Sequence, residues 1–260
     1  MESKQDFDDT APFREPLEDT VIFSERLKKL RSSPDKLVKE WPLYSRRERK
    51  EKDFEVELNK RTVEFKRGMA VFHELEERYG IAIPKIDLIV GEEVSDGRIQ
   101  MFSVVDKIQG QDLMRASGLP NSAKDKFDQF FSVMTQHSID TYREGGDCWD
   151  DLIPEQIMYG HKTGGEEDKI YIVDTDPRYY AFGKGGPDID ILYKCLKSVT
   201  DCIETAESKF ANFVVLEKAR ENLVKIIDFV SKDHSDNDSD FMDLKAQAEK
   251  YSNQAPAKAA

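Results

Sequence analysis

The sequence WDDLIPEQIMY occupies residues 149–159, and IYIVDTDP follows at residues 170–177. Asp151 precedes Gln156 by five positions, and Asp174 follows Gln156 by eighteen. The second sequence reads as an apolar strand that ends in Asp174. A carboxylate, an amide oxygen and a second carboxylate at a strand end are the groups that position a hydroxyl and Mg²⁺ against a phosphate. Asp151, Gln156 and Asp174 are therefore the first candidates for a functional site.

The composition is that of a polar, soluble chain. Its 260 residues are enough for one or two domains with a real core, with 38% hydrophobic and 35% charged residues. No apolar run approaches the roughly 20 residues of a membrane helix. The first 20 residues lack the apolar segment of a secretion signal. We therefore expect a cytoplasmic protein with no membrane partner.

The net charge limits the partners that we expect, and the cysteines indicate the compartment. The net charge of −13 argues against non-specific nucleic-acid binding. A local basic run between Arg26 and Arg67 is typical of a solvated face, although it suits a phosphate or an acidic partner as well. Three cysteines fit a reducing compartment, and no Cys/His spacing suggests zinc. We expect Cys195 and Cys202 to lie on a helix and to be buried in the protein core.

The first 106 residues read as strand, strand, helix, strand, strand. The strands are expected at 20–23, 36–41, 86–90 and 99–105, with a further short strand near 27–31. A long helix is expected from about residue 53 to residue 78, closed by Gly80.

Helical periodicity dominates the rest of the chain. One helix should start near Ser122 and stop at Gly145, with an aromatic core stripe at Phe127, Phe130 and Phe131. Two more stripes follow, at 189–203 and 213–230. Residues 233–260 read as a largely disordered acidic and Ala-rich tail, with a possible short helix at 241–251.

A small β-lobe with one long helix, then a hinge and a helical lobe, resembles the two-lobe protein-kinase-like fold. This α+β chain looks closest to the compact branch that includes aminoglycoside phosphotransferase-like kinases. The resemblance implies a flexible arm at 1–19, an N-lobe at 20–106, a helical C-lobe at 107–232 and a tail at 233–260.

In the small lobe, the resemblance implies a nucleotide site. Lys39 looks like the lysine of the third strand, which contacts the ATP phosphates, and a glutamate of the long helix pairs with it. Glu64 is the candidate for that glutamate, with Glu57 and Glu74 as alternatives. The adenine is expected beside the hinge strand, from Val104 to Lys107, with Val105 and Lys107 as the residues that bind it.

In the large lobe, the resemblance implies the chemistry. Asp151 matches the catalytic aspartate that orients or deprotonates the attacking hydroxyl. Gln156 matches the metal-binding Asn and Asp174 the metal aspartate, with Asp176 as a further metal ligand or a turn cap. ATP and Mg²⁺ are the cofactors that this set implies.

The chain also departs from the family pattern. No glycine lies between residues 23 and 30, where a phosphate-binding loop is expected, and the family's His before the catalytic aspartate is absent, with Trp149-Asp150 in its place. Gln156 is one methylene longer than Asn, and Mg²⁺ tolerates poor geometry badly. The segment after Asp176 is short for a protein kinase. It fits a small-molecule kinase or a pseudokinase.

Three hypotheses remain open. The first is an ATP-dependent phosphotransferase with an unidentified hydroxyl acceptor, for which a small molecule is favoured over a protein. The second is a pseudokinase that acts as a nucleotide- or protein-binding regulatory module. The third is a helical interaction protein that has no nucleotide site, and a structure without the small β-lobe would support it.

Overall fold

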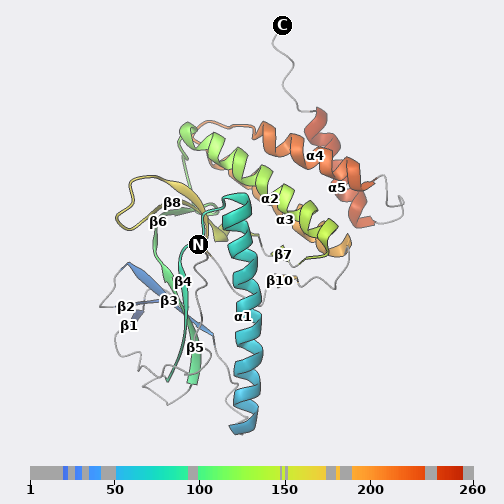
Figure 1. Cartoon of the computed structure of the whole chain (residues 1–260). Helices are drawn as coiled ribbons and strands as arrows, with labels where there is room; N and C mark the ends of the chain where they lie inside the picture. The colour runs from blue at the N-terminus through green and yellow to red at the C-terminus, as the bar shows by residue number, and fades with distance from the viewer. Residues whose placement is uncertain are drawn as a thin grey trace. The chain divides into compact units, whose positions relative to one another are not determined.

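The computed structural model describes residues 20–22, 27–30, 35–41, 51–92, 99–146, 148–149, 152–173, 180–181, 189–231 and 239–253 (Figure 1). The chain is α+β. It divides into two compact units, one formed by Met1–Val63 with Pro84–Lys107 and the other by Glu64–Ile83 with Ile108–Ala260. No helix among the described residues is long and apolar enough to cross a membrane.

The first unit holds a five-stranded antiparallel sheet. Its order is β1-β2-β3-β5-β4, with bounds Thr20–Ile22, Leu27–Leu30, Lys36–Trp41, Ile99–Asp106 and Ile86–Glu92. Val38 on β3 is fully buried, whereas its neighbours Leu37 and Lys39 are half-buried on the opposite face. The four expected strands and the further short strand are confirmed.

Helix α1, Glu51–Tyr79, follows β3 and confirms the long helix expected at 53–78. Phe65, Phe72 and Leu75 form its buried stripe, at the spacing of one helical face. The helix ends because Gly80 adopts a φ of +69°, in the left-handed region. The boundary between the two units passes through α1, between Val63 and Glu64.

The second unit contains a three-stranded antiparallel sheet. Its order is β6-β8-β9, with bounds Ile108–Asp112, Ile157–Lys162 and Lys169–Ile172. Gly110 lies opposite Gly160, and a Cβ on Gly110 would lie 2.8 Å from the Cα of Gly160. The backbones of β6 and β8 approach this closely because neither residue has a side chain. Ala82, beyond α1, forms a parallel bridge with Tyr171 of β9.

The structure also has two short strands and two 3₁₀ turns among its described residues. The short strands β7, Cys148–Trp149, and β10, Tyr180–Ala181, pair with each other. The 3₁₀ turns η1, Asn121–Ala123, and η2, Pro154–Gln156, precede α2 and β8 respectively.

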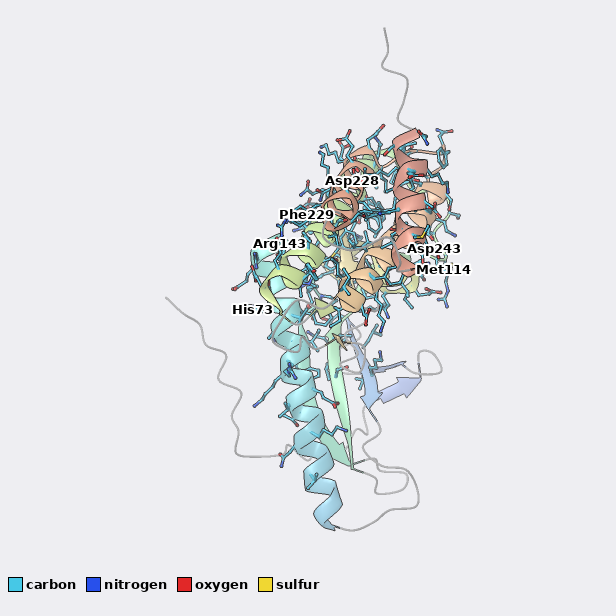
Figure 2. The ribbon with its side chains drawn as sticks, turned by 90° about the vertical axis from the view of Figure 1, so that its right-hand side faces the viewer. His73, Met114, Arg143, Asp228, Phe229 and Asp243 are labelled. Carbon is cyan, nitrogen blue, oxygen red and sulfur yellow. The ribbon has the colours of Figure 1, made fainter. Side chains whose placement is uncertain are left out.

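Three helices form the core of the second unit: α2 (Lys124–Glu144), α3 (Ile189–Lys209) and α4 (Glu217–Ser231). The aromatic stripe of α2 is buried, as are Cys195 and Cys202 on α3, so both expectations are confirmed. The stripe expected from residue 213 is wrong at its start. Phe213 is 71% exposed, because α4 begins only at Glu217. The guanidinium carbon of Arg143 on α2 lies 4.6 Å from the ring centroid of Phe229 on α4 (Figure 2).

A side chain of α2 caps the first turn of α4. The Asp128 carboxylate on α2 is buried and accepts hydrogen bonds from the backbone N–H of Lys218, at 3.3 Å, and of Ala219, at 2.8 Å. A carboxylate at this place satisfies N–H groups that have no partner within the helix and complements its dipole.

The C-terminal segment differs from the expected disordered tail. Residues Ser239–Asn253 form α5, which is longer than the possible short helix. Its buried face, with Leu244, Ala248 and Tyr251, is apolar. The Arg220 guanidinium stacks over the Tyr251 ring, with its carbon 4.3 Å from the centroid.

A buried ion pair lies under α5. Arg220 Nε donates to Glu207 Oε1 at 2.7 Å, and the same oxygen accepts the Leu216 N–H at 2.8 Å. Both charged groups are buried, so each depends on the other for compensation.

Candidate functional site

The segment from Leu152 to Gln156 runs through the second unit directly before β8. Pro154 opens the 3₁₀ turn, where its restricted φ suits the first position. Leu152 and Ile157 are buried on either side of the turn, and Gln156 itself is 5% exposed. The sequence therefore folds into a short turn in which Ile153 and Glu155 are exposed and the amide side chain of Gln156 lies inside the unit.

The hairpin of β8 and β9 brings Gln156 to the end of β9. Ile157 pairs with Ile172, and the Val173 N–H donates to the Gln156 carbonyl oxygen at 2.9 Å. Asp174 is the next residue in the sequence after Val173. The register of the hairpin thus places Gln156 beside the strand end that leads to Asp174.

The predicted carboxylates lie outside the described residues. This holds for Asp151, which precedes Leu152 in the sequence, and for Asp174 and Asp176. The structure therefore brings together the chain segments that flank two of them, and their own positions stay predictions. Among the described residues, no group of three or more His, Cys, Asp or Glu side chains forms a metal cluster.

The described part of the predicted metal site fits Mg²⁺ in its chemistry. Gln156 offers an amide oxygen, which is a hard donor of the kind that Mg²⁺ accepts. Its backbone is held on both sides, since its N–H donates to the Ile153 carbonyl at 3.0 Å and its own carbonyl accepts from Val173. A donor on a restrained backbone suits a metal that demands regular geometry.

The predicted phosphate-binding pair is divided between the two units. Lys39 lies on β3 of the first unit, opposite Leu27 on β2 and Ser103 on β5, with a half-buried side chain. Glu64 lies on α1 as the first residue of the second unit and is also half-buried. The pairing of Lys39 with Glu64 stays a prediction.

At the predicted hinge, the backbone N–H groups that an adenine edge would bind already donate hydrogen bonds within the first unit. Val105 is buried, opposite Leu37 and Ile86 in its two ladders. The Lys107 N–H donates to the Asp35 carbonyl at 2.7 Å. The Asp106 N–H donates to the Lys85 carbonyl at 3.0 Å. A base bound here would compete with these hydrogen bonds.

An ion pair beside the hinge was missed in the sequence. Lys36, at the start of β3, donates to the Asp106 carboxylate at the end of β5. That hydrogen bond to Asp106 raises the pKa of Lys36 above its ordinary value. Both residues stand at strand ends in the sequence, but only the β3–β5 register shows that they are opposite each other.

Comparisons with known proteins give little. No protein-family model matches the chain. No curated protein matches it either. Among solved structures, the chain is similar to one described as WaaP in complex with acyl carrier protein, at 13% identity and a TM-score of 0.44, over 90% of this chain and 88% of that one. A likeness this distant does not bear on the function.

Proposed function

We propose that the chain is a kinase-like phosphotransferase that uses ATP and Mg²⁺, with a small-molecule hydroxyl as the favoured acceptor. The hydrogen bond from the Val173 N–H to the Gln156 carbonyl carries this proposal. It joins the segment that follows Asp151 to the strand that precedes Asp174. The three polar residues of the sequence pattern therefore stem from two backbone segments that are in direct contact.

Each of these residues has a role that its chemistry supports. Asp151 would orient the acceptor hydroxyl and take its proton. Gln156 would offer its amide oxygen to the metal ion, alongside the carboxylates of Asp174 and Asp176. When bound, Mg²⁺ supplies neutralisation of the phosphate charge.

The first unit supports the nucleotide half of the proposal. Its antiparallel sheet carries Lys39 on the third and central strand, and α1 follows that strand directly. A sheet of this order with a long helix after its third strand is compatible with the small lobe that the kinase resemblance implies, although α1 from Glu64 onward belongs to the second unit. We propose that Lys39 contacts the phosphates and that Glu64 is its partner.

A regulatory pseudokinase is the second candidate. The engaged N–H groups of Asp106 and Lys107 favour it, because they leave fewer donors for a base. The absence of glycine between residues 23 and 30 favours it as well. A structure without the small β-lobe would have supported the third hypothesis, and the first unit instead holds a five-stranded sheet.

The proposal is tested first by nucleotide binding. The thermal unfolding of the full chain is followed with millimolar ATP, with and without Mg²⁺, for the wild type and for Asp174→Ala. Asp228→Asn, on the exposed surface of α4 (Figure 2), is a control that also removes one negative charge. We expect a Mg²⁺-dependent stabilisation in the wild type and the control that Asp174→Ala loses. No stabilisation in any of them would refute a nucleotide site.

Turnover separates the enzyme from the pseudoenzyme. ATP consumption is measured for the wild type, Asp151→Asn and Gln156→Asn. The phosphotransferase predicts turnover that Asp151→Asn abolishes and that Gln156→Asn retains, because Asn keeps the amide ligand. Nucleotide binding without turnover would favour the pseudokinase.

A further inference from the structure

Helix α5 lies against α4 and α3 through one narrow face (Figure 1). Among its described side chains the buried apolar ones are Leu244, Ala248 and Tyr251, at the i, i+4 and i+7 positions of a helix. Met242 on the same helix is 56% exposed. The helix therefore docks as an amphipathic element whose apolar residues follow a simple pattern.

The surface beneath α5 offers a cation to an aromatic ring. On α4, the guanidinium carbon of Arg220 lies 4.3 Å from the ring centroid of Tyr251. Arg220 Nε also donates to Glu207 Oε1 of α3 at 2.7 Å. Because Glu207 restrains the guanidinium from the α3 side, a ring that docks here meets a cation that is already positioned.

A carboxylate on the same surface receives the polar edge of α5. Glu204 of α3 accepts a hydrogen bond from Lys250 Nζ at 2.9 Å, and Gln247 Nε2 donates to the same oxygen. The side chains of Glu204 and Lys250 are 41% and 51% exposed, so this contact sets orientation more than affinity. The surface thus selects an aromatic residue over Arg220 and a cation beside Glu204.

Helix α5 depends on this surface for its stability. It has 15 residues, and an isolated helix of about that length is marginal in water. The buried stripes of α3 and α4 are longer than that of α5. Segments with few buried contacts open first, so we expect α5 to leave its site while α2, α3 and α4 stay folded.

We propose that α5 is a detachable helix and that the α3–α4 surface beneath it is a docking site for an amphipathic helix of a partner protein. The partner helix carries the pattern of α5, with two apolar residues four positions apart, an aromatic residue three positions further on, and a lysine directly before that residue. In the free chain α5 occupies the site and competes with the partner. This inference does not depend on the proposed phosphotransfer.

The detachment of α5 is tested by hydrogen exchange on the full-length chain. We expect the backbone amides of α5 to exchange by local opening, at least about tenfold faster than the slowest amides of α2, α3 and α4. If the amides of α5 exchange only as slowly as those of the three core helices, α5 opens with the whole unit and the proposal is wrong.

The docking site is tested with a fluorescent peptide of residues 239–253. Tyr251→Ala in the full-length chain removes the ring over Arg220 and leaves α3 and α4 unaltered, so its own α5 competes less. We expect the peptide to bind this variant about tenfold more tightly than it binds the wild-type chain. Leu244→Ala, at another buried contact of α5, is the second variant, and circular dichroism checks that both are folded.

Variants of the peptide identify what the surface recognises. On the Tyr251→Ala chain, a peptide with Tyr251→Ala should bind about tenfold more weakly than the wild-type peptide. A peptide with Met242→Ala, changed at an exposed position, should bind like the wild type. Absence of peptide binding, equal affinity for both chains, or equal affinity of all three peptides would overturn the docking site. A concentration-dependent dimer of the wild type that Tyr251→Ala abolishes would assign the surface to α5 of a second copy and overturn the partner helix.

Discussion

Mild acid should destabilise the second unit through His137. This imidazole on α2 is 2% exposed, and its ring edge meets the Tyr79 ring at a centroid distance of 5.2 Å. Its Nδ1 lies 3.5 Å from Thr141 Oγ1, and its Nε2 has no hydrogen-bond partner among the described residues. A protonated ring would therefore carry a buried charge with little compensation.

Burial is the main reason why the pKa of His137 falls from 6.5 to about 4. Arg78 lowers it further, whereas Asp140 and Glu144 oppose the change. In the unfolded chain the imidazole takes up its proton near pH 6.5, but in the folded chain it does so only near pH 4. The unfolded state thus binds more protons between these values, and stability is lost as the pH falls through them. The whole window is worth about 3 kcal/mol of the free energy of unfolding, and the part between about pH 7.5 and 5.5 about 1 kcal/mol.

The assay compares pH dependences rather than absolute stabilities. Urea unfolding is followed by far-UV circular dichroism at several pH values for the wild type and His137→Phe, a variant that keeps a ring against Tyr79. Between about pH 7.5 and 5.5, the variant should lose about 1 kcal/mol less of its free energy of unfolding than the wild type. His73→Phe on α1 removes a 66% exposed imidazole and should keep the wild-type dependence. Equal pH dependences for the wild type and His137→Phe would refute the reasoning.

Three substitutions test the packing of the second unit by chemical denaturation. Gly160→Ala would drive a Cβ into the Gln109 carbonyl, so we expect a loss of about 3 kcal/mol, and a loss below about 1 kcal/mol would contradict the close approach. Asp128→Ala removes the acceptor for two N–H groups of α4 and should cost about 1–2 kcal/mol, and a neutral result would show that α4 does not need this cap. Glu207→Gln leaves the Arg220 guanidinium buried without its counter-charge and should cost about 3 kcal/mol, whereas an unchanged midpoint would mean that water compensates it.

The sequence pattern was sufficient to predict those helices and strands whose own residues show a clear apolar spacing and a clear end. The apolar spacing of α1 and its closing Gly80 predicted that helix to within about two residues at each end. Strand β6 has no such signal, because Ile108–Asp112 contains a single apolar residue and a glycine. Its pairing with β8 depends on the facing Gly110 and Gly160, which are far apart in the sequence. Such a strand is created by its partner rather than by its own pattern.

Helix α5 was underestimated for a related reason. The composition of residues 233–260 is that of a disordered tail, and among its described side chains Leu244, Ala248 and Tyr251 are the buried apolar ones. The helix is stabilised by the surface it meets, since Tyr251 stacks on Arg220 and Lys250 pairs with Glu204 at 2.9 Å. No property of the segment alone reveals that surface.

For the candidate site too, some features could be predicted from the sequence and others depend on contacts across a sheet. The spacing from Asp151 to Gln156 and on to Asp174 is local information, and it drew attention to two segments that the structure brings into contact at Gln156. The contact of Gln156 with Val173 depends on the hairpin register, and the ion pair of Lys36 with Asp106 depends on the β3–β5 register. Register is set by pairing across the sheet, so the sequence alone could not supply either contact.

The two ends of the proposed nucleotide site lead to a prediction about the base. Recognition of a base edge requires backbone N–H donors, and those of Asp106 and Lys107 already donate within the first unit. In the proposed site the phosphate end would rely on side chains such as Lys39, whose positive charge attracts any nucleoside triphosphate. We therefore expect ATP and GTP, each with Mg²⁺, to raise the unfolding temperature to a similar degree, whereas a pocket specific for adenine or for guanine would favour one of them. A shift with ATP that GTP fails to produce would show that the hinge exchanges its internal hydrogen bonds for the base.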